Sequence, residues 1–267
     1  MIPSALKRLL MLVPPVRDYV LRNRQTAAEL AELRARTAPI PLGNFRPPAE
    51  LPAMNGDEQA LVDRFLDFYV GPWREDHERL NIGWLGCQTQ KSPNDLWTYQ
   101  ELIVEQLPDV IFETGTRFGG SALFLATVCE LIGKGQVVTI DVDDRPGRPQ
   151  HPRITYIHGS SIDPAIFARA RGHLPEDGKA LVVLDSDHSQ DHVRQELELY
   201  APLIPVGGYI VVEDTIVNGH PTYPEHGPGP MEGLDDFLAS CDDFVIDPAR
   251  ERFLMTCNPR GFLRRVR

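Results

Sequence analysis

The segment that decides the fold reads Val110-Ile-Phe-Glu-Thr-Gly-Thr-Arg-Phe-Gly-Gly-Ser-Ala-Leu-Phe-Leu-Ala-Thr-Val128. It opens with a short apolar run, Val110 to Phe112, which is typical of a buried parallel strand. A glycine-rich turn follows, and from Ser121 the apolar residues recur at helical spacing. Glycines let the backbone approach a ligand closely, and a helix N-terminus offers unpaired N–H groups. The segment therefore predicts a strand, a turn and a helix that form one corner of a nucleotide-binding site.

The turn departs from the Gly-x-Gly-x-x-Gly pattern that binds a pyrophosphate. An acid two residues before the first glycine instead suits a cationic ligand that carries no phosphate. S-adenosylmethionine (SAM) is such a ligand, because it has a sulfonium and an amino group. We therefore expect a SAM site, and the alternative is a connection that binds no ligand. The candidate cofactor residues of the turn are Glu113, Gly115, Thr116, Arg117, Gly119 and Ser121.

A second acid stands where the ribose of a nucleoside would need it. The apolar run 137–140 predicts the next strand and ends in Asp141, whose carboxylate can accept both ribose hydroxyls. Asp143 and Asp144 are alternatives for this role. A third strand is expected over 154–157, and the turn after it contains Ser160 and Ser161, where the adenine would lie.

Two further strands are each followed by acids. The apolar runs 180–184 and 209–212 lead into Asp185-Ser-Asp187 and Glu213-Asp214. The carboxyl ends of parallel strands meet at one edge of a sheet, so these four carboxylates are expected to gather there. Their mutual repulsion is relieved by a hard divalent cation, and Mg²⁺ prefers oxygen ligands. We expect a magnesium site, and the alternative is a set of acids that cap helices or pair with arginines.

The candidate catalytic residues are His188 and Asp185. A histidine beside a metal-bound hydroxyl can take its proton, because its ordinary pKa is near neutral. Asp187 is an alternative base if Asp185 is a metal ligand. Lys91 and Asp95 precede the first strand of the sheet, so they are candidates for a lid over the cofactor, and the alternative is a solvated loop. Lys91 and Asp185 are also candidate cofactor residues. The long Pro- and Gly-rich loop 215–230 is expected to shape the acceptor pocket.

The order of the elements predicts an α/β fold. A helix is expected over 231–240, and two last strands, 244–247 and 253–256, follow with a short turn that makes them antiparallel. The result is a doubly wound, Rossmann-like sheet of seven strands with one antiparallel strand, the topology of class I methyltransferases. We assign this domain to residues 57–267, and a helical arm with a Pro-rich linker to residues 1–56.

The N-terminal arm is basic, with seven Lys or Arg and three acidic residues in positions 1–36. Residues 5–13 predict a short amphipathic helix, which would pack against a partner subunit in a homo-oligomer or contact an anionic membrane surface. No apolar run approaches the 18 residues or so that a transmembrane helix needs.

Composition narrows the class of protein. The 267 residues carry a net charge of −11, which argues against sequence-independent binding to nucleic acid. Four cysteines lie far apart without a C-x-x-C pair, which indicates a reducing compartment. We therefore expect a cytoplasmic protein.

Several motifs together resemble the cephalosporin hydroxylase family over roughly residues 57–257. They are Trp84-Leu-Gly, Lys91-Ser-Pro-Asn-Asp95, Glu113-Thr-Gly-Thr-Arg-Phe-Gly-Gly-Ser121, Leu184-Asp-Ser-Asp-His188, Glu213-Asp-Thr215, Asn218-Gly-His220 and Gly227-Pro-Gly-Pro230. The resemblance implies a class I methyltransferase that acts on hydroxyls of natural products, including deoxysugars such as rhamnose. It also implies a Mg²⁺ site formed by Asp187, Glu213 and Asp214, whereas related sugar methyltransferases favour Asp185, and both assignments stay open.

The expected reaction is Mg²⁺-dependent transfer of a methyl group from SAM to a hydroxyl of a small molecule or glycan. One alternative is a protein that kept the SAM-binding fold without catalysis. Another is an iron-dependent hydroxylase, which usually needs two histidines and one carboxylate. His188 and His192 could supply only part of that set, and the glycine turn would then have no purpose.

Overall fold

The computed structural model describes residues 39–70 and 82–267. The two helices expected within 5–13 and 18–36 lie outside these residues. Residues 39–55 contain no helix or strand, in keeping with the predicted linker, and Pro41–Arg267 cluster as one unit. The division of the chain at residue 56 stays a prediction.

A seven-stranded sheet forms the centre of this unit, in the order β5-β4-β3-β6-β7-β9-β8. The first five strands of that order run parallel, and β9 pairs antiparallel with both β7 and β8. The fold class is therefore as expected, with one reversed strand near an edge. The strands are β3 (Val110–Thr114), β4 (Gln136–Asp141), β5 (Ile154–His158), β6 (Ala180–Leu184), β7 (Tyr209–Val212), β8 (Phe244–Ile246) and β9 (Phe262–Arg265).

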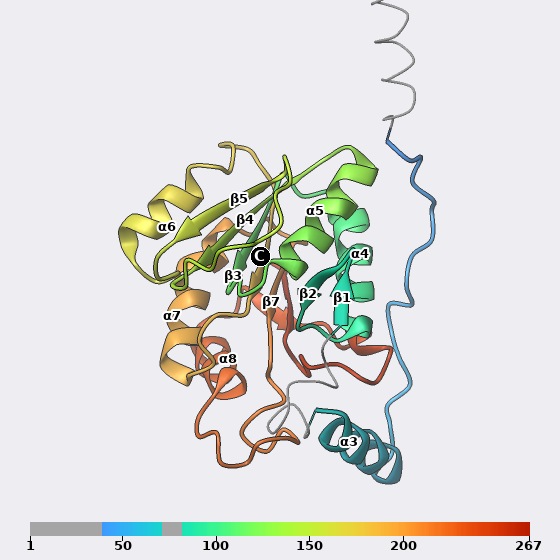
Figure 1. The fold of residues 1–267 in the computed structure, drawn as a ribbon. Coiled ribbons are helices and arrows are strands. Elements are labelled where there is room, and N and C mark those ends of the chain that lie inside the picture. The colour runs from blue at the N-terminus through green and yellow to red at the C-terminus, as the bar shows by residue number, and fades with distance from the viewer. Residues whose placement is uncertain (1–38, 71–81) are drawn as a thin grey trace, which may run out of the picture. The chain divides into compact units, whose positions relative to one another are not determined.

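Helices cover both faces of the sheet (Figure 1). On one face, α4 (Pro93–Gln106) and α5 (Gly120–Ile132) pack against side chains such as Ile111 and Val211. On the other, α6 (Pro164–Arg171), α7 (Gln190–Tyr200) and α8 (Pro230–Ser240) pack against neighbours in the strands such as Phe112 and Val212. Both faces of the strands are buried, which explains why the strand sequences are continuously apolar instead of alternating.

Local signals set where the helices begin. Ser92 caps α4 by accepting a hydrogen bond from the backbone N–H of Asn94. Asp163 caps α6 in the same way, and Pro164 occupies the first helical position. The start of α5 is different, because Gly119 adopts a left-handed backbone and no side chain caps the helix. The first turn of α5 therefore keeps free N–H groups at the end of β3.

The last predicted strand, 253–256, was wrong. The chain forms the 3₁₀ helix η3 (Pro248–Glu251) and then an irregular segment, in which Leu254 takes a left-handed backbone. Asp95 binds the end of this segment through the N–H of Cys257, so the backbone there does not pair with a strand. The place beside β7 goes to β9, where Phe262 and Leu263 are fully buried.

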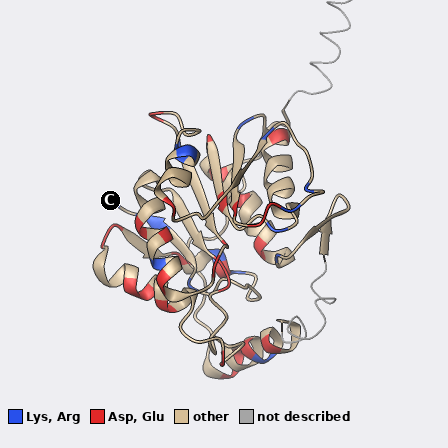
Figure 2. Ribbon diagram, turned by 60° about the vertical axis from the view of Figure 1, so that its left-hand side comes forward, with Lys and Arg blue, Asp and Glu red and all other residues tan. Residues whose placement is uncertain are grey.

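Helix α3 (Gly56–Val70) lies at the start of the domain that the sequence analysis assigns from residue 57. Acidic residues outnumber basic ones along it, with four acids and one arginine (Figure 2). Before α4, the chain forms a small hairpin of β1 (Ile82–Trp84) and β2 (Cys87–Thr89). Within the described ranges, no helix combines the length and the apolar character needed to cross a membrane.

Candidate active site

A cavity of about 590 Å³ opens at the carboxyl ends of β3, β4, β5 and β6. Its lining includes every residue that the sequence predicts for the cofactor except Glu113, which lies directly behind it in β3. The residues brought together there are Lys91, Gly115, Thr116, Arg117, Gly119, Ser121, Asp141, Ser160, Ser161 and Asp185.

Glycine is required at the centre of this wall. Gly115 has a φ of +83°, and a Cβ built on it would lie 1.7 Å from the carbonyl oxygen of Asp185. Gly120, at the start of α5, would place a Cβ 2.2 Å from the carbonyl oxygen of Gln88. The backbone after β6 therefore contacts the glycine turn, and the backbone of the hairpin contacts the start of α5. The uncapped N–H groups at the start of α5 face the cavity, whose lining includes Gly119, Gly120 and Ser121.

Glu113 is fully buried and only half satisfied. Its Oε2 accepts a hydrogen bond of 2.6 Å from the hydroxyl of Thr139, while Oε1 has no partner. Burial raises the pKa of this carboxyl, although nearby Lys91 partly offsets the effect. A buried carboxylate with an unpaired oxygen is a fitting partner for an ammonium group, which is what the amino acid end of SAM carries.

Two residues that line the cavity were not predicted from the sequence. The Oγ1 of Thr89 and the Oε1 of Gln90 are buried and unpartnered, and both residues line the cavity. Thr89 ends strand β2 of the hairpin and Gln90 follows it, and no motif in the sequence marks them. Only the contact between β2 and α5 places them beside the glycine turn.

Asp141 lies at the end of β4, as expected, and is tightly held. Its Oδ2 accepts hydrogen bonds from the N–H groups of Thr116 and Arg117 and from the guanidinium of Arg148. Its Oδ1 accepts one from the N–H of Asp143 and keeps further capacity for a ligand hydroxyl. Its role towards a ribose stays a prediction.

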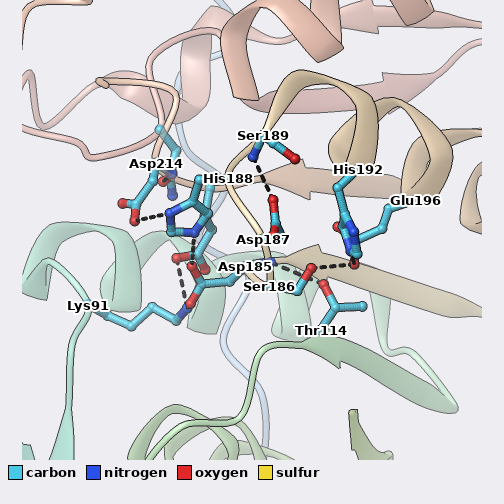
Figure 3. A network of polar contacts seen from close by, with 12 residues as sticks. Lys91, Thr114, Asp185, Ser186, Asp187, His188, Ser189, His192, Glu196 and Asp214 are labelled. Carbon is cyan, nitrogen blue, oxygen red and sulfur yellow. Dashed lines mark hydrogen bonds and ion pairs between the residues drawn. The ribbon is translucent and has the colours of Figure 1, made fainter. Parts of the chain in front are cut away.

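Beyond Asp141, hydroxyl and imidazole groups line the cavity. Ser161 Oγ lies 3.1 Å from Nε2 of His192, and Ser186 donates a hydrogen bond of 2.7 Å to the buried Glu196. Figure 3 shows that His192 and Glu196 lie apart from the acids at the other end of the cavity. His192 is therefore separate from His188.

At that other end, Asp185, His188 and Asp214 come together. One ligand atom from each lies within 4.8 Å of the others. His188 stands between the two acids, with Nε2 3.3 Å from Asp185 Oδ1 and Nδ1 3.6 Å from Asp214 Oδ2 (Figure 3). Two carboxylates and an imidazole at this spacing form a donor set that a divalent cation fits.

Asp187 does not join this group. It is exposed, and its Oδ1 accepts a hydrogen bond of 2.9 Å from the N–H of Ser189 at the start of α7 (Figure 3). This hydrogen bond lowers the pKa of Asp187. The structure thus brings Asp185, in place of Asp187, together with Asp214, because only the first acid after β6 points towards β7.

Glu213 is buried beside the group and already has two partners. Its Oε1 accepts a hydrogen bond of 2.7 Å from the hydroxyl of Tyr99, and its Oε2 lies 2.7 Å from Nζ of Lys91. Lys91 also pairs with Asp185. Lys91 is 5% exposed and lines the cavity, so its place over the cofactor stays a prediction, whereas Asp95 is 2% exposed and does not line the cavity, so the expectation of a lid was wrong for Asp95. They are fixed in the interior because each has buried hydrogen-bonding partners.

The acids of the cluster repel one another, and this repulsion and their burial shift their pKa values. Burial raises the pKa of Glu213 and of Asp214, and repulsion from Asp185 adds to it. Burial also opposes the charge of Asp185, but Lys91 and His188 outweigh it and lower that pKa. Burial alone would lower the pKa of His188, but Asp214 and Asp185 raise it to about 9. The cluster therefore favours an added positive charge.

Only one histidine belongs to the cluster found among the described residues. His192, the second histidine considered for an iron site, contacts Ser161 and Glu196 instead. The set of two histidines and one carboxylate that a hydroxylase usually uses is not assembled around His188.

Known proteins share the part of the sequence that contains this site. The family model for Rhamnosyl O-methyltransferase/CmcI matches residues 78–266. The rhamnosyl O-methyltransferase of Mycobacterium tuberculosis is 39% identical over 218 residues, covering 76% of this chain and 84% of that protein. The protein of the same name from Mycobacterium leprae is 40% identical over 186 residues, covering 67% of this chain and 81% of that protein.

Solved structures show the same fold. An apo structure of CmcI matches with a TM-score of 0.55 and 22% identity, covering 86% of this chain and 89% of that one. A structure of CmcI with Mg and SAM matches with a TM-score of 0.54 and 22% identity, covering 86% and 91%. The family model and the mycobacterial relatives together cover the cavity and both of its ends, and the chain belongs to the Rhamnosyl O-methyltransferase/CmcI family.

Proposed function

We propose that the protein is an O-methyltransferase that moves a methyl group from SAM to a hydroxyl of a sugar or natural product, with Mg²⁺ bound at the acid cluster. One observation carries this proposal. A single cavity is lined by the glycine turn, with the half-satisfied Glu113 buried beside that turn in β3, and has the group Asp185, His188 and Asp214 at its end. A cationic methyl donor and a cation-assisted acceptor would therefore meet inside it.

The position of each residue in the cavity suggests its role in the reaction. Glu113 and the N-terminus of α5 suit the amino and carboxylate groups of the donor, and Asp141 suits its ribose. A bound Mg²⁺ would supply Lewis-acid stabilisation for the negative charge that develops on the acceptor oxygen. His188 would take the hydroxyl proton in its neutral form, which a dication beside the ring would favour over the imidazolium that Asp185 and Asp214 stabilise. The cavity itself holds both reactants close and limits water.

For the metal ligands, we propose Asp185 and Asp214 as the core of the set. Glu213 adjoins them through Lys91, and Asp187 lies outside because it accepts the N–H of Ser189, the residue before α7. The earlier assignment to Asp187, Glu213 and Asp214 stays a prediction that metal-binding measurements on single variants can decide.

Removing the metal tests the proposal. Methyl transfer to a panel of deoxysugar acceptors should stop when the protein is treated with EDTA and should return with Mg²⁺. Binding of S-adenosylhomocysteine (SAH), the product of the donor, should persist in EDTA, because Glu113 and the glycine turn do not depend on the cation. Turnover that survives rigorous chelation would remove the metal from the scheme, and failure to bind SAH would remove the enzyme class.

A rhamnose-like deoxysugar is the acceptor we propose to test first. The support is the name shared by the mycobacterial relatives, rhamnosyl O-methyltransferase, at 39% and 40% identity. Free rhamnose, nucleotide-linked rhamnose and a rhamnosyl glycan should be compared. A methylated product from any of them supports the acceptor class, and the hydroxyl position follows from the mass spectrum of its fragments.

We also propose that the protein works in the cytoplasm as a homo-oligomer, as the cysteine pattern and the basic N-terminal arm suggest. Light scattering of the full chain would measure the mass of the assembly. Contact of the arm with anionic membranes stays a prediction, which a vesicle flotation assay can test.

A further inference from the structure

Asp214 stands on an unusual backbone. Its φ is +53°, in the left-handed region that few residues other than glycine and asparagine adopt readily. Its N–H is buried and donates a hydrogen bond of 3.0 Å to Oδ1 of Asn258. Asn258 therefore satisfies the one backbone donor that this conformation would otherwise leave unpaired.

The same asparagine extends to Glu213 through a tyrosine. Because Oδ1 of Asn258 faces an N–H group, its Nδ2 is the atom that donates a hydrogen bond of 2.9 Å to the hydroxyl of Tyr99. That hydroxyl has one proton, which it donates to Oε1 of Glu213 over 2.7 Å. Tyr99 and Asn258 are each 1% exposed. One short chain of bonds thus holds the backbone of Asp214 and the side chain of Glu213.

This chain of bonds is itself anchored to α4. Asp95, in the first turn of that helix, accepts hydrogen bonds from the N–H of Cys257 and from the hydroxyl of Thr256. The same threonine oxygen accepts the N–H of Asn258. Because Tyr99 belongs to α4 as well, both ends of the network rest on one helix.

We infer that Tyr99 and Asn258 are positioning residues for the cation site. Asn258 fixes the backbone of Asp214, and Tyr99 fixes Glu213, which holds Lys91 beside Asp185, so that Asp185 and Asp214 keep the orientation needed to bind a divalent cation. This inference rests on the proposed function, because it concerns the cation site. Apolar side chains would fill the same space without the cost of burying polar groups. The polar network is instead directed at two adjacent acids and fixes both the backbone and the side-chain rotamer. Hydrogen-bonding partners behind a metal site typically contribute tenfold to 100-fold in metal affinity.

The test measures metal binding directly. Mn²⁺, which electron paramagnetic resonance detects, is titrated into the metal-free full chain and into Tyr99→Phe and Asn258→Ala. We expect Tyr99→Phe to weaken Mn²⁺ binding about tenfold or more. SAH binding in EDTA should stay within twofold of the unmodified protein. Tyr209→Phe is the matched control, because Tyr209 of β7 is buried in the same hydrophobic cluster as Tyr99 and is hydrogen-bonded, but to Asp247 and Arg250.

The outcomes separate the possible failures. If Tyr99→Phe binds Mn²⁺ as tightly as the unmodified protein, the network has only a structural role and the inference is overturned. The same conclusion follows if Tyr209→Phe weakens Mn²⁺ binding equally. If its melting curve shows that Asn258→Ala is folded, the Mn²⁺ affinity of this variant is a second test of the inference. If Asn258→Ala does not fold, Tyr99→Phe decides alone. A metal-free protein that binds neither Mn²⁺ nor SAH would refute the proposed function instead.

Discussion

Lys91 and Glu213 form a buried ion pair, with Nζ 2.7 Å from Oε2 and both side chains nearly inaccessible to water. The ammonium also pairs with Asp185, so one lysine compensates two of the acids at the strand ends. Burial acts against its charge, yet Asp185 and Glu213 together raise its pKa. Lys91 therefore stays charged and holds Asp185 and Glu213 together.

Replacing Lys91 by methionine should destabilise the protein strongly. Removing one partner from a buried pair leaves uncompensated charge and typically costs about 3–5 kcal/mol in the free energy of unfolding. Urea unfolding without metal measures the change. Lys134→Met is the control, because its pair with Asp109 is partly exposed and should contribute less than about 1 kcal/mol. Equal losses in the two variants would contradict the assigned role of Lys91.

The glycine turn offers a second test with a matched pair. Gly115 and Gly147 have φ values of +83° and +86°, so alanine at either position costs about 1–2 kcal/mol for the left-handed backbone. Only at Gly115 would the new Cβ collide with another part of the chain, since Gly147 has open space around it. Gly115→Ala should therefore lose SAH affinity by at least about tenfold, or about 1.4 kcal/mol. Gly147→Ala should keep it, and calorimetry that found no difference would remove Gly115 from the cofactor site.

The sequence predicted most of the sheet because buried parallel strands have continuously apolar sequences. It predicted the carboxyl-end site as well, since Asp141, Asp185, Glu213 and Asp214 each follow such a run. The last strand was predicted in the wrong place because the apolar pattern favours another segment. Phe253-Leu-Met is more apolar than Phe262-Leu-Arg-Arg265, which forms the strand. Asp95, about 160 residues earlier in the chain, fixes the first segment outside the sheet, and such a contact leaves no local trace.

The fine structure of the cation site was hidden for a similar reason. Asp185 and Asp187 are two residues apart and look equivalent in the sequence. Their difference arises from Ser189, whose N–H binds Asp187, and from Lys91, which pairs with Asp185. The roles of Tyr99 and Asn258 depend on hydrogen bonds that span more than 100 residues. Such partners become visible only when the fold brings the segments together.

The protonation of His188 should depend on the cation. Without metal, the pKa of about 9 lies above the ordinary 6.5, so the folded protein binds this proton more tightly than the unfolded chain. The resulting stabilisation is complete below pH 6.5 and is lost as the pH rises through about 9. A dication beside the ring would disfavour the imidazolium, so Mg²⁺ should lower the pKa. Histidine proton resonances, followed by NMR over pH 5 to 10 with and without Mg²⁺, measure both values, and an unchanged titration would place the metal elsewhere.

The choice between Asp185 and Asp187 can be made with two isosteric variants. Asp185→Asn should reduce Mn²⁺ affinity by more than about 100-fold, because loss of a direct ligand exceeds the effect of a residue behind the site. Asp187→Asn should leave Mn²⁺ binding and turnover nearly unchanged, since the amide oxygen can still accept the N–H of Ser189. Electron paramagnetic resonance with each purified variant gives the affinities, and SAH binding serves as the check on folding. The reverse order of losses would assign the metal to Asp187, as the family resemblance implied, and would require that acid to turn away from α7 when the cation binds.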